Sequence, residues 1–252
     1  MLHHLANTAT ACLGTLGLLL TLACTQPKPS VQMTTPTNAG SRHFLALGDS
    51  YTIGESVPEA DRWPVQFARL ARAKGIDLAN PDIIAKTGWT TAELAEAIAA
   101  SGNTNSYDLV SLLIGVNNQY RGQELDRYKT EFTGLLQTAI RFAKGRPEHV
   151  MVLSIPDWGA SPFAKDRDPV AIGQQIDRFN AAAKQVCNQH KVTFIDITPL
   201  TRAAAGDATQ FAPDGLHYSG KQMKQWAEAV RREFNVARRC RLRASRPSTG
   251  SG

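Results

Sequence analysis

The strongest constraint on the fold is a fivefold alternation between short apolar runs and longer segments with helical spacing. Five strand–helix units in succession predict a parallel sheet covered by helices on both faces. Burial on both faces explains why the strands are continuously apolar. The predicted strands cover 43–48, 82–85, 108–114, 149–155 and 192–197, and the predicted helices cover 62–74, 90–100, 124–142, 169–190 and 219–234.

The 252-residue chain holds one domain of ordinary size, predicted over 42–237. Residues 1–23 carry no Asp, Glu, Lys or Arg and end in an apolar run that suits a signal-peptide core but is too short to span a bilayer. The following Cys24 completes a match to a bacterial lipoprotein cleavage site, except at Thr21. We expect export to the periplasm, to a membrane as a lipoprotein lipidated at Cys24, or to the medium. The alternative is a frayed N-terminus on a cytoplasmic protein.

Two further segments differ from the domain in composition. Residues 24–41 are rich in Pro, Thr and Ser, which predicts a flexible tether. The tail 238–252 holds five of the arginines and no acidic residue, so that the net charge of +6 falls to about +1 without it. We expect a disordered, solvated tail, the alternative being contact with an anionic surface such as phospholipid headgroups. Because the positive charge belongs to a tail, we expect no binding of nucleic acid.

Cys187 and Cys240 are the two cysteines outside the N-terminal segment. They could pair in an oxidising compartment. The helical pattern around Cys187 favours a small buried side chain instead, and we expect two free thiols. The Cys and His spacings do not match a metal site.

The first motif that carries chemistry is Gly48-Asp49-Ser50, directly after the first predicted strand. A serine hydroxyl is a poor nucleophile without a base that takes its proton. This serine leaves a buried strand on a tight turn and enters a helical turn, which exposes the hydroxyl and directs backbone N–H groups toward it. Taken alone, a turn with a helix cap explains the motif equally well.

A second motif, Asp214-Gly215-Leu216-His217, lies between the last strand and the last helix. An offset of three residues lets the Asp214 carboxylate reach the imidazole, fix its tautomer and stabilise its charged form. The alternative is an Asp-Gly turn followed by a surface histidine. In a parallel sheet, ligands bind beyond the carboxyl ends of the strands, so that Ser50 and His217 are predicted at the same edge.

Gly88 and Asn117 follow the second and third strands at that edge. Singly, Gly88 could be a turn with positive φ and Asn117 a loop cap. Together with the other motifs they predict an oxyanion hole made of the Ser50 and Gly88 N–H groups and the Asn117 amide. The set predicts acyl transfer with Ser50 as nucleophile, His217 as base and Asp214 as the group that orients the histidine.

These motifs span about residues 43–220 and resemble the four sequence blocks of the GDSL, or SGNH, hydrolases, in the order that the family has them. The resemblance implies a flavodoxin-like three-layer α/β/α sandwich with a five-stranded parallel sheet, a serine nucleophile, and no metal or organic cofactor. The chain departs from the family at Tyr51, where Leu is usual, and at Asn118, where Asp is usual. The second departure puts the geometry of that loop in doubt.

Several residues near this edge are candidates for substrate contact. We expect Tyr120 and Trp158 to bind substrate, although Trp158, like Phe163, is equally explained as an aromatic that covers the core. Arg121 could bind a substrate anion, but we expect it to pair with Glu124. The connection 155–169 is long enough for a variable substrate loop.

The leading hypothesis is a monomeric serine esterase that acts on a small-molecule ester and attaches to a membrane if Cys24 is lipidated. A cell-envelope acyltransferase would use the same residues and differ in excluding water. A non-catalytic envelope binding protein is a third hypothesis, and the presence of Ser50, Asn117, Asp214 and His217 together argues against it.

Overall fold

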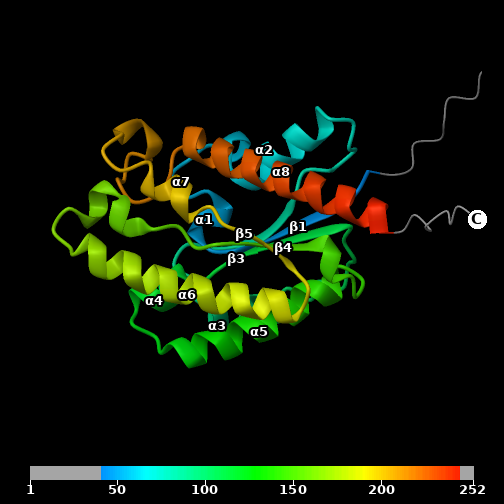
Figure 1. Cartoon of the computed structure of the whole chain (residues 1–252), viewed down its shortest axis with the longest axis horizontal. Coiled ribbons are helices and arrows are strands. Elements are labelled where there is room, and N and C mark those ends of the chain that lie inside the picture. Colours follow the sequence, from blue (N-terminus) through cyan, green and yellow to red (C-terminus); the bar gives the residue numbers. More distant parts are fainter. Residues whose placement is uncertain (1–40, 245–252) are drawn as a thin grey trace, which may run out of the picture. The chain divides into compact units, whose positions relative to one another are not determined.

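The computed structural model describes residues 41–244, with side-chain surroundings up to Glu233. Within this range the chain forms a five-stranded parallel sheet with helices on both faces (Figure 1), which confirms the predicted fold class. The strand order is β2-β1-β3-β4-β5, and the strands are β1 (Phe44–Gly48), β2 (Asp82–Ala85), β3 (Leu109–Leu113), β4 (Val150–Leu153) and β5 (Thr193–Ile195).

The long helices match the predicted positions, α1 forms the predicted helical turn after Gly48-Asp49, and α4 and α7 are short additions. The α-helices are α1 (Ser50–Ile53), α2 (Trp63–Arg72), α3 (Thr91–Ala100), α4 (Val116–Tyr120), α5 (Leu125–Phe142), α6 (Pro169–Gln189), α7 (Thr198–Arg202) and α8 (Gly220–Ala244). Short turns of 3₁₀ helix are η1 (Glu59–Asp61), η2 (Pro147–His149), η3 (Trp158–Ala160), η4 (Pro162–Ala164) and η5 (Ala208–Gln210).

The core lies between the sheet and two helical layers. Helices α2 and α8 pack together on one face, while α3, α5 and α6 pack side by side on the other (Figure 1). Every residue of β1, β3 and β4 is buried, which is the physical basis of their almost wholly apolar sequence, with Ser111 in β3 as the one polar side chain of these strands. Helix α5 turns one apolar stripe inward, made of Tyr128, Phe132, Leu135, Leu136, Ala139 and Phe142.

The strand register brings the functional loops to one edge. Gly48, the last residue of β1, is paired with Ala85 in β2 and with Leu113 in β3. The chain therefore leaves three adjacent strands at the same level. A Cβ atom at Gly48 would overlap the Thr52 side chain and the Leu113 carbonyl oxygen. Glycine is thus required for the turn from β1 into α1.

The predicted start of α3 is confirmed in detail. Thr90 is its N-cap, with Oγ1 accepting a hydrogen bond from the Glu93 N–H at 3.4 Å. The Glu93 carboxylate accepts one in return from the Thr90 N–H at 2.7 Å. This reciprocal capping box satisfies two backbone donors that a helix start leaves without intrahelical partners.

Helix α8 continues to Ala244, ten residues beyond its predicted end at 234. The prediction of a disordered tail from residue 238 is therefore wrong for its first seven residues. No Gly or Pro interrupts 221–244, and the Ala, Arg, Leu and Lys found there favour helix. The rest of that tail, the predicted signal peptide with Cys24, and all but the last residue of the tether lie outside the described residues.

Cys187 lies in α6 as a buried free thiol. Burial raises the pKa of this thiol to about 12, so that it stays protonated and packs as a small apolar side chain. Within residues 41–244, no helix combines the length and the apolar character that crossing a membrane requires.

Candidate active site

The predicted nucleophile begins a helix directly after β1, which lies between β2 and β3 in the sheet. Ser50 is the first residue of α1, and Asp49 is the N-cap whose Oδ1 accepts a hydrogen bond from the Tyr51 N–H at 3.0 Å. The first N–H groups of a helix have no intrahelical partner, so that the Ser50 N–H is free to meet a ligand oxygen. The predicted helical turn after the Gly-Asp pair is confirmed.

The second half of the site is an ordered Asp–His pair. Asp214 Oδ2 accepts a hydrogen bond from His217 Nδ1 at 2.7 Å, and Asp214 Oδ1 accepts bonds of 2.9 Å from the N–H groups of Leu216 and His217. The carboxylate places the ring proton on Nδ1 and leaves Nε2 as the basic nitrogen. The predicted contact between Asp214 and His217 is thus present.

The charge of Asp214 follows from its hydrogen bonds. Burial alone would raise the pKa of this carboxyl group, but the bonds from His217, Ser56 and the two backbone N–H groups outweigh it and hold the pKa well below its ordinary value. Asp214 is therefore anionic at neutral pH.

An aromatic cluster places the histidine beside the nucleophile segment. The Tyr51 and His217 rings meet edge to face with centroids 5.8 Å apart. Tyr51 also packs against Tyr218 and Trp226, with centroids at 5.8 and 6.1 Å, and all three rings are buried. Tyr51, which stands where the family usually has Leu, thus packs against the loop that carries His217 and joins it to the segment that carries Ser50.

The predicted oxyanion donors lie on two adjacent loops that are hydrogen-bonded to each other. Gly88 has a φ of +86°, a conformation that other residues adopt only with strain. Asn117 donates one amide hydrogen to the Trp89 carbonyl oxygen at 2.9 Å. Its second amide hydrogen remains for a ligand. The loop after β2 and the loop after β3 are therefore joined beside the turn that holds Ser50.

Arg121 holds the loop after β2, which carries Gly88. Its predicted pairing with Glu124 is wrong. Its Nη2 donates to the Gly88 carbonyl oxygen at 2.6 Å, and its Nη1 lies 3.2 Å from the Glu93 carboxylate. Helix α4 places Arg121 in front of the N-terminus of α3, where Glu93 is already held by its capping box. The guanidinium thus supports the loop that carries Gly88.

Asn118, the second departure from the family, is buried and fully engaged. Its Oδ1 accepts a hydrogen bond from the Thr91 N–H at 3.1 Å, and its Nδ2 donates to Thr91 Oγ1 at 2.6 Å and to Gln123 Oε1. These bonds attach the loop after β3 to the first turn of α3. Asn118 is therefore an anchor of the loop that carries Asn117.

The three aromatic candidates form one cluster beside the site. Trp158 is buried and donates from Nε1 to Gln119 Oε1 at 2.8 Å. Tyr120 and Phe163 are 51% and 43% exposed, and their rings pack edge-on against Trp158 with centroids at 5.3 and 6.2 Å. The Phe163 N–H donates to the Gly215 carbonyl oxygen at 2.9 Å, which puts this ring next to the histidine loop. Tyr120 and Phe163 therefore face solvent, with Trp158 beneath them.

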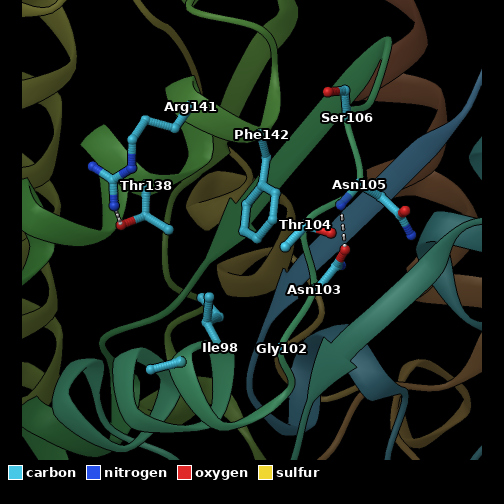
Figure 2. Close-up of a pocket in the computed structure, with 10 residues that line it drawn as sticks. Ile98, Gly102, Asn103, Thr104, Asn105, Ser106, Thr138, Arg141 and Phe142 are labelled. Atoms are coloured by element: carbon cyan, nitrogen blue, oxygen red, sulfur yellow. Dashed lines mark hydrogen bonds between the residues drawn. The ribbon is translucent and has the colours of Figure 1, made fainter.

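A cavity of about 430 Å³ lies elsewhere on the molecule (Figure 2). It is lined by the end of α3, the loop 102–106 and the last turns of α5, where Arg141 donates to Thr138 Oγ1. This loop leads into β3, so that the cavity is at the amino ends of the strands. Figure 2 shows short polar side chains and the Phe142 ring around it, without a paired nucleophile and base.

Some residues at the site carry no recognisable sequence signal. Ser56 donates from Oγ to Asp214 Oδ2 at 2.7 Å, and Gln119 links Trp158 to Gln175. Neither Ser56 nor Gln119 belongs to a sequence motif. Both contact residues that are distant in the sequence and that only the fold brings near. Within the described residues, no group of three or more Cys, His, Asp or Glu is arranged to hold a metal ion.

Comparison with known proteins identifies similar chains. Residues 46–225 match the GDSL-like Lipase/Acylhydrolase family. A search of curated proteins finds no match.

Among solved structures, the chain is similar to TesA, with 17% identity, a TM-score of 0.63, and coverage of 78% of this chain and 99% of that one. The acetylxylan esterase Axe2 from Geobacillus stearothermophilus shows 18% identity, a TM-score of 0.60 and coverages of 77% and 95%. The psychrotrophic esterase EstA from Pseudoalteromonas sp., in a structure inhibited by monoethylphosphonate, shows 15% identity, a TM-score of 0.59 and coverages of 81% and 100%. At these identities the likeness establishes the shared fold.

Proposed function

We propose that this chain, which belongs to the GDSL-like lipase/acylhydrolase family and is therefore a hydrolase, is a serine esterase that works through an acyl-enzyme intermediate. The observation that carries the proposal is the meeting of two distant motifs. The 2.7 Å bond between Asp214 and His217 supports His217 as the base, and the packing of His217 against Tyr51, the residue next to Ser50, supports its pairing with that serine.

The proposed reaction begins with attack by Ser50 Oγ on the ester carbonyl carbon while His217 Nε2 takes the hydroxyl proton. Asp214 keeps the imidazole in the required tautomer and stabilises its charge. His217 then returns the proton to the leaving alcohol, which leaves an acyl group on Ser50. Water, activated by the same histidine, releases the carboxylic acid and restores the serine.

The negative charge that develops on the carbonyl oxygen needs fixed donors. We propose the N–H groups of Ser50 and Gly88 and the second amide hydrogen of Asn117. The Asn117 bond to the Trp89 carbonyl and the Arg121 bond to the Gly88 carbonyl support this assignment, because they orient the Asn117 amide and hold the loop that carries Gly88 before substrate arrives. Donors that are oriented in advance need no reorganisation during the reaction.

We propose that substrate contacts the aromatic cluster through Tyr120 and Phe163, whose rings pack against the buried Trp158. Exposed rings next to the histidine loop offer apolar area to an acyl chain or to the face of a sugar ring. The bond from Trp158 to Gln119 fixes the orientation of the buried ring. The contribution of Trp158 to binding is thus made through the two exposed rings.

We also propose that the protein is exported as a monomer, with Cys24 as its membrane anchor. The support is the segment 1–23, which carries no Asp, Glu, Lys or Arg, ends in an apolar run and is followed by Cys24. Cell fractionation and metabolic labelling with a fatty acid test this, with Cys24→Ala as the control. A labelled, membrane-bound wild type and an unlabelled variant are expected, whereas an unlabelled cytoplasmic wild type would contradict the proposal.

The catalytic proposal is tested with a short-chain aryl ester and the variant Ser50→Ala. Turnover by this variant should fall to the background rate. Ser106→Ala is a matched control, since Ser106 is exposed in the loop before β3, at the other end of the strands. Undiminished hydrolysis by Ser50→Ala would refute the assignment.

The same assay with a sugar acceptor distinguishes hydrolysis from acyl transfer. The esterase proposal expects free carboxylic acid as the main product in the presence of the sugar. Acylated sugar as the main product would instead identify a transferase that uses the same residues.

A further inference from the structure

The segment 54–57, which follows α1, contacts both halves of the site. The Glu55 carboxylate accepts a hydrogen bond from Thr87 Oγ1, in the loop that carries the proposed oxyanion glycine. The next residue, Ser56, donates from its hydroxyl to Asp214 Oδ2 at 2.7 Å. The stretch of chain that follows the nucleophile is therefore tied to the oxyanion loop on one side and to the acid of the triad on the other.

Ser56 and the catalytic histidine share one oxygen atom. Asp214 Oδ2 accepts from Ser56 Oγ and from His217 Nδ1, each at 2.7 Å, while Oδ1 accepts from two backbone N–H groups. Both oxygens thus have two donors, and the plane of the carboxylate is fixed by bonds from two directions. Without Ser56, Oδ2 would keep the histidine as its one protein donor among the described residues.

The backbone of Ser56 adds a second observation. Its φ is +64°, and among the described residues the other non-glycine positions with positive φ are Lys144 and Lys191. This conformation is costly for a residue with a side chain, and it persists where surrounding contacts hold it. A turn alone would favour glycine at this position. The serine supplies a hydroxyl in a place where the backbone gains nothing from a side chain.

We propose that Ser56 is a positioning residue, whose hydroxyl holds the Asp214 carboxylate in the orientation that His217 needs. The inference rests on the proposed function, because Asp214 and His217 are taken as the acid and base of the triad. Bonds to an ionised group are the stronger class of hydrogen bond, and losing one is expected to reduce kcat by about tenfold. The effect on KM should be less than about twofold, because Ser56 contacts Asp214 rather than the substrate.

Two substitutions separate the hydroxyl from the backbone. Ser56→Ala removes the hydroxyl and keeps the strained turn, whereas Ser56→Gly removes the hydroxyl and suits the positive φ. The proposal expects both variants to lose about tenfold in kcat. A Ser56→Gly variant with wild-type kcat would overturn it, since the residue would then serve the turn alone. Lys191→Gly is the matched control for glycine at a positive φ, and its kcat should equal that of the wild type.

A double-mutant cycle tests whether Ser56 acts through Asp214. In an Asp214→Ala background the hydroxyl has no carboxylate to hold, so that adding Ser56→Gly should cause no further loss. A further tenfold loss in that background would overturn the proposal. Ser50→Ala in the same assay separates the role of Ser56 from the proposed function. If Ser50→Ala failed to abolish turnover, the proposed function itself would be refuted.

A measurement without substrate completes the test. The proton on His217 Nδ1 gives a far-downfield NMR signal when it is bonded to a carboxylate. We expect this signal to shift in Ser56→Gly and to stay in place in Lys191→Gly. An unchanged signal in Ser56→Gly would overturn the proposal even in a protein without measurable turnover.

Discussion

Two aspartates flank the candidate site, one beside Ser50 and one beside His217, and the fold treats them in opposite ways. Asp49 is wholly buried, with Oδ1 bonded to the Tyr51 N–H and Oδ2 without a partner among the described residues. Burial raises the pKa of Asp49 to about 7, against the weaker effect of its backbone hydrogen bonds. Asp214 receives four hydrogen bonds, and its pKa is held well below the ordinary value.

Burial and the number of hydrogen-bond donors together, and not the distance to a candidate catalytic residue, decide which carboxyl group carries a charge. Asp214 is anionic and can orient the imidazole, whereas Asp49 holds its proton over much of the acidic range and caps a helix. The same division separates Asn117 from Asn118. Asn117 keeps one amide hydrogen for a ligand, and Asn118 uses its whole amide to anchor a loop.

The largest effect is expected at Asp214. Asp214→Asn should reduce kcat by about 10⁴-fold, because an amide neither stabilises the imidazolium nor enforces the required tautomer. Steady-state kinetics on an aryl ester, with circular dichroism to verify folding, measure this. A loss below tenfold would show that the Asp–His bond is structural.

Asn117→Ala should come next, with a loss of about 10²–10³ in kcat if its amide stabilises the oxyanion. Asn118→Asp is the matched control at the neighbouring position, since a carboxylate retains an acceptor for the Thr91 N–H. That control is expected to stay within about tenfold of the wild type. Equal losses in both variants would remove the distinction between them.

Asp49→Asn should have a small effect on turnover at neutral pH. The amide has nearly the shape of the protonated carboxyl group and keeps an acceptor for the Tyr51 N–H. We expect kcat within about tenfold of the wild type. A loss as large as that of Asp214→Asn would mean that an anionic Asp49 takes part in the reaction.

The smallest and most specific effect is on the pH dependence of stability. A carboxyl group whose pKa rises on folding binds its proton more tightly in the folded state, so that its stabilising contribution is present at low pH. That contribution is lost as the pH rises from the ordinary value of 3.8 to about 7. Asn does not titrate, so the variant Asp49→Asn lacks this pH-dependent contribution.

Urea unfolding at pH 5 and pH 8 measures this effect. The stability of Asp49→Asn relative to the wild type should increase with pH, by up to about 1.4 kcal/mol per pH unit within the window. A difference that is constant with pH would contradict the raised pKa of Asp49.

The sequence was sufficient to predict the sheet and the edge that carries the site. Short, mainly apolar runs indicate the strands, and parallel strands release their loops at one edge, so that Ser50, Gly88, Asn117 and His217 are predicted at the same edge. The contact between Asp214 and His217 was predictable because it is local, across three residues.

The contacts that support the site were not predictable, because they join residues far apart in the chain. Ser56 and Asp214 are 158 positions apart, and nothing in the sequence marks the positive φ that aims the serine. Arg121 was expected to pair with its neighbour Glu124, but the turn of α4 brings it to Glu93 and the Gly88 carbonyl. Nearness in sequence was a poor guide to its partner.

The most direct test of the central claim is to label the folded wild-type protein with a fluorophosphonate and to map the adduct by mass spectrometry. We expect one adduct per chain, on Ser50, which is absent in Ser50→Ala and forms much more slowly in Asp214→Asn. An adduct on another residue, or labelling that persists in Ser50→Ala, would contradict the assignment of Ser50 as the nucleophile.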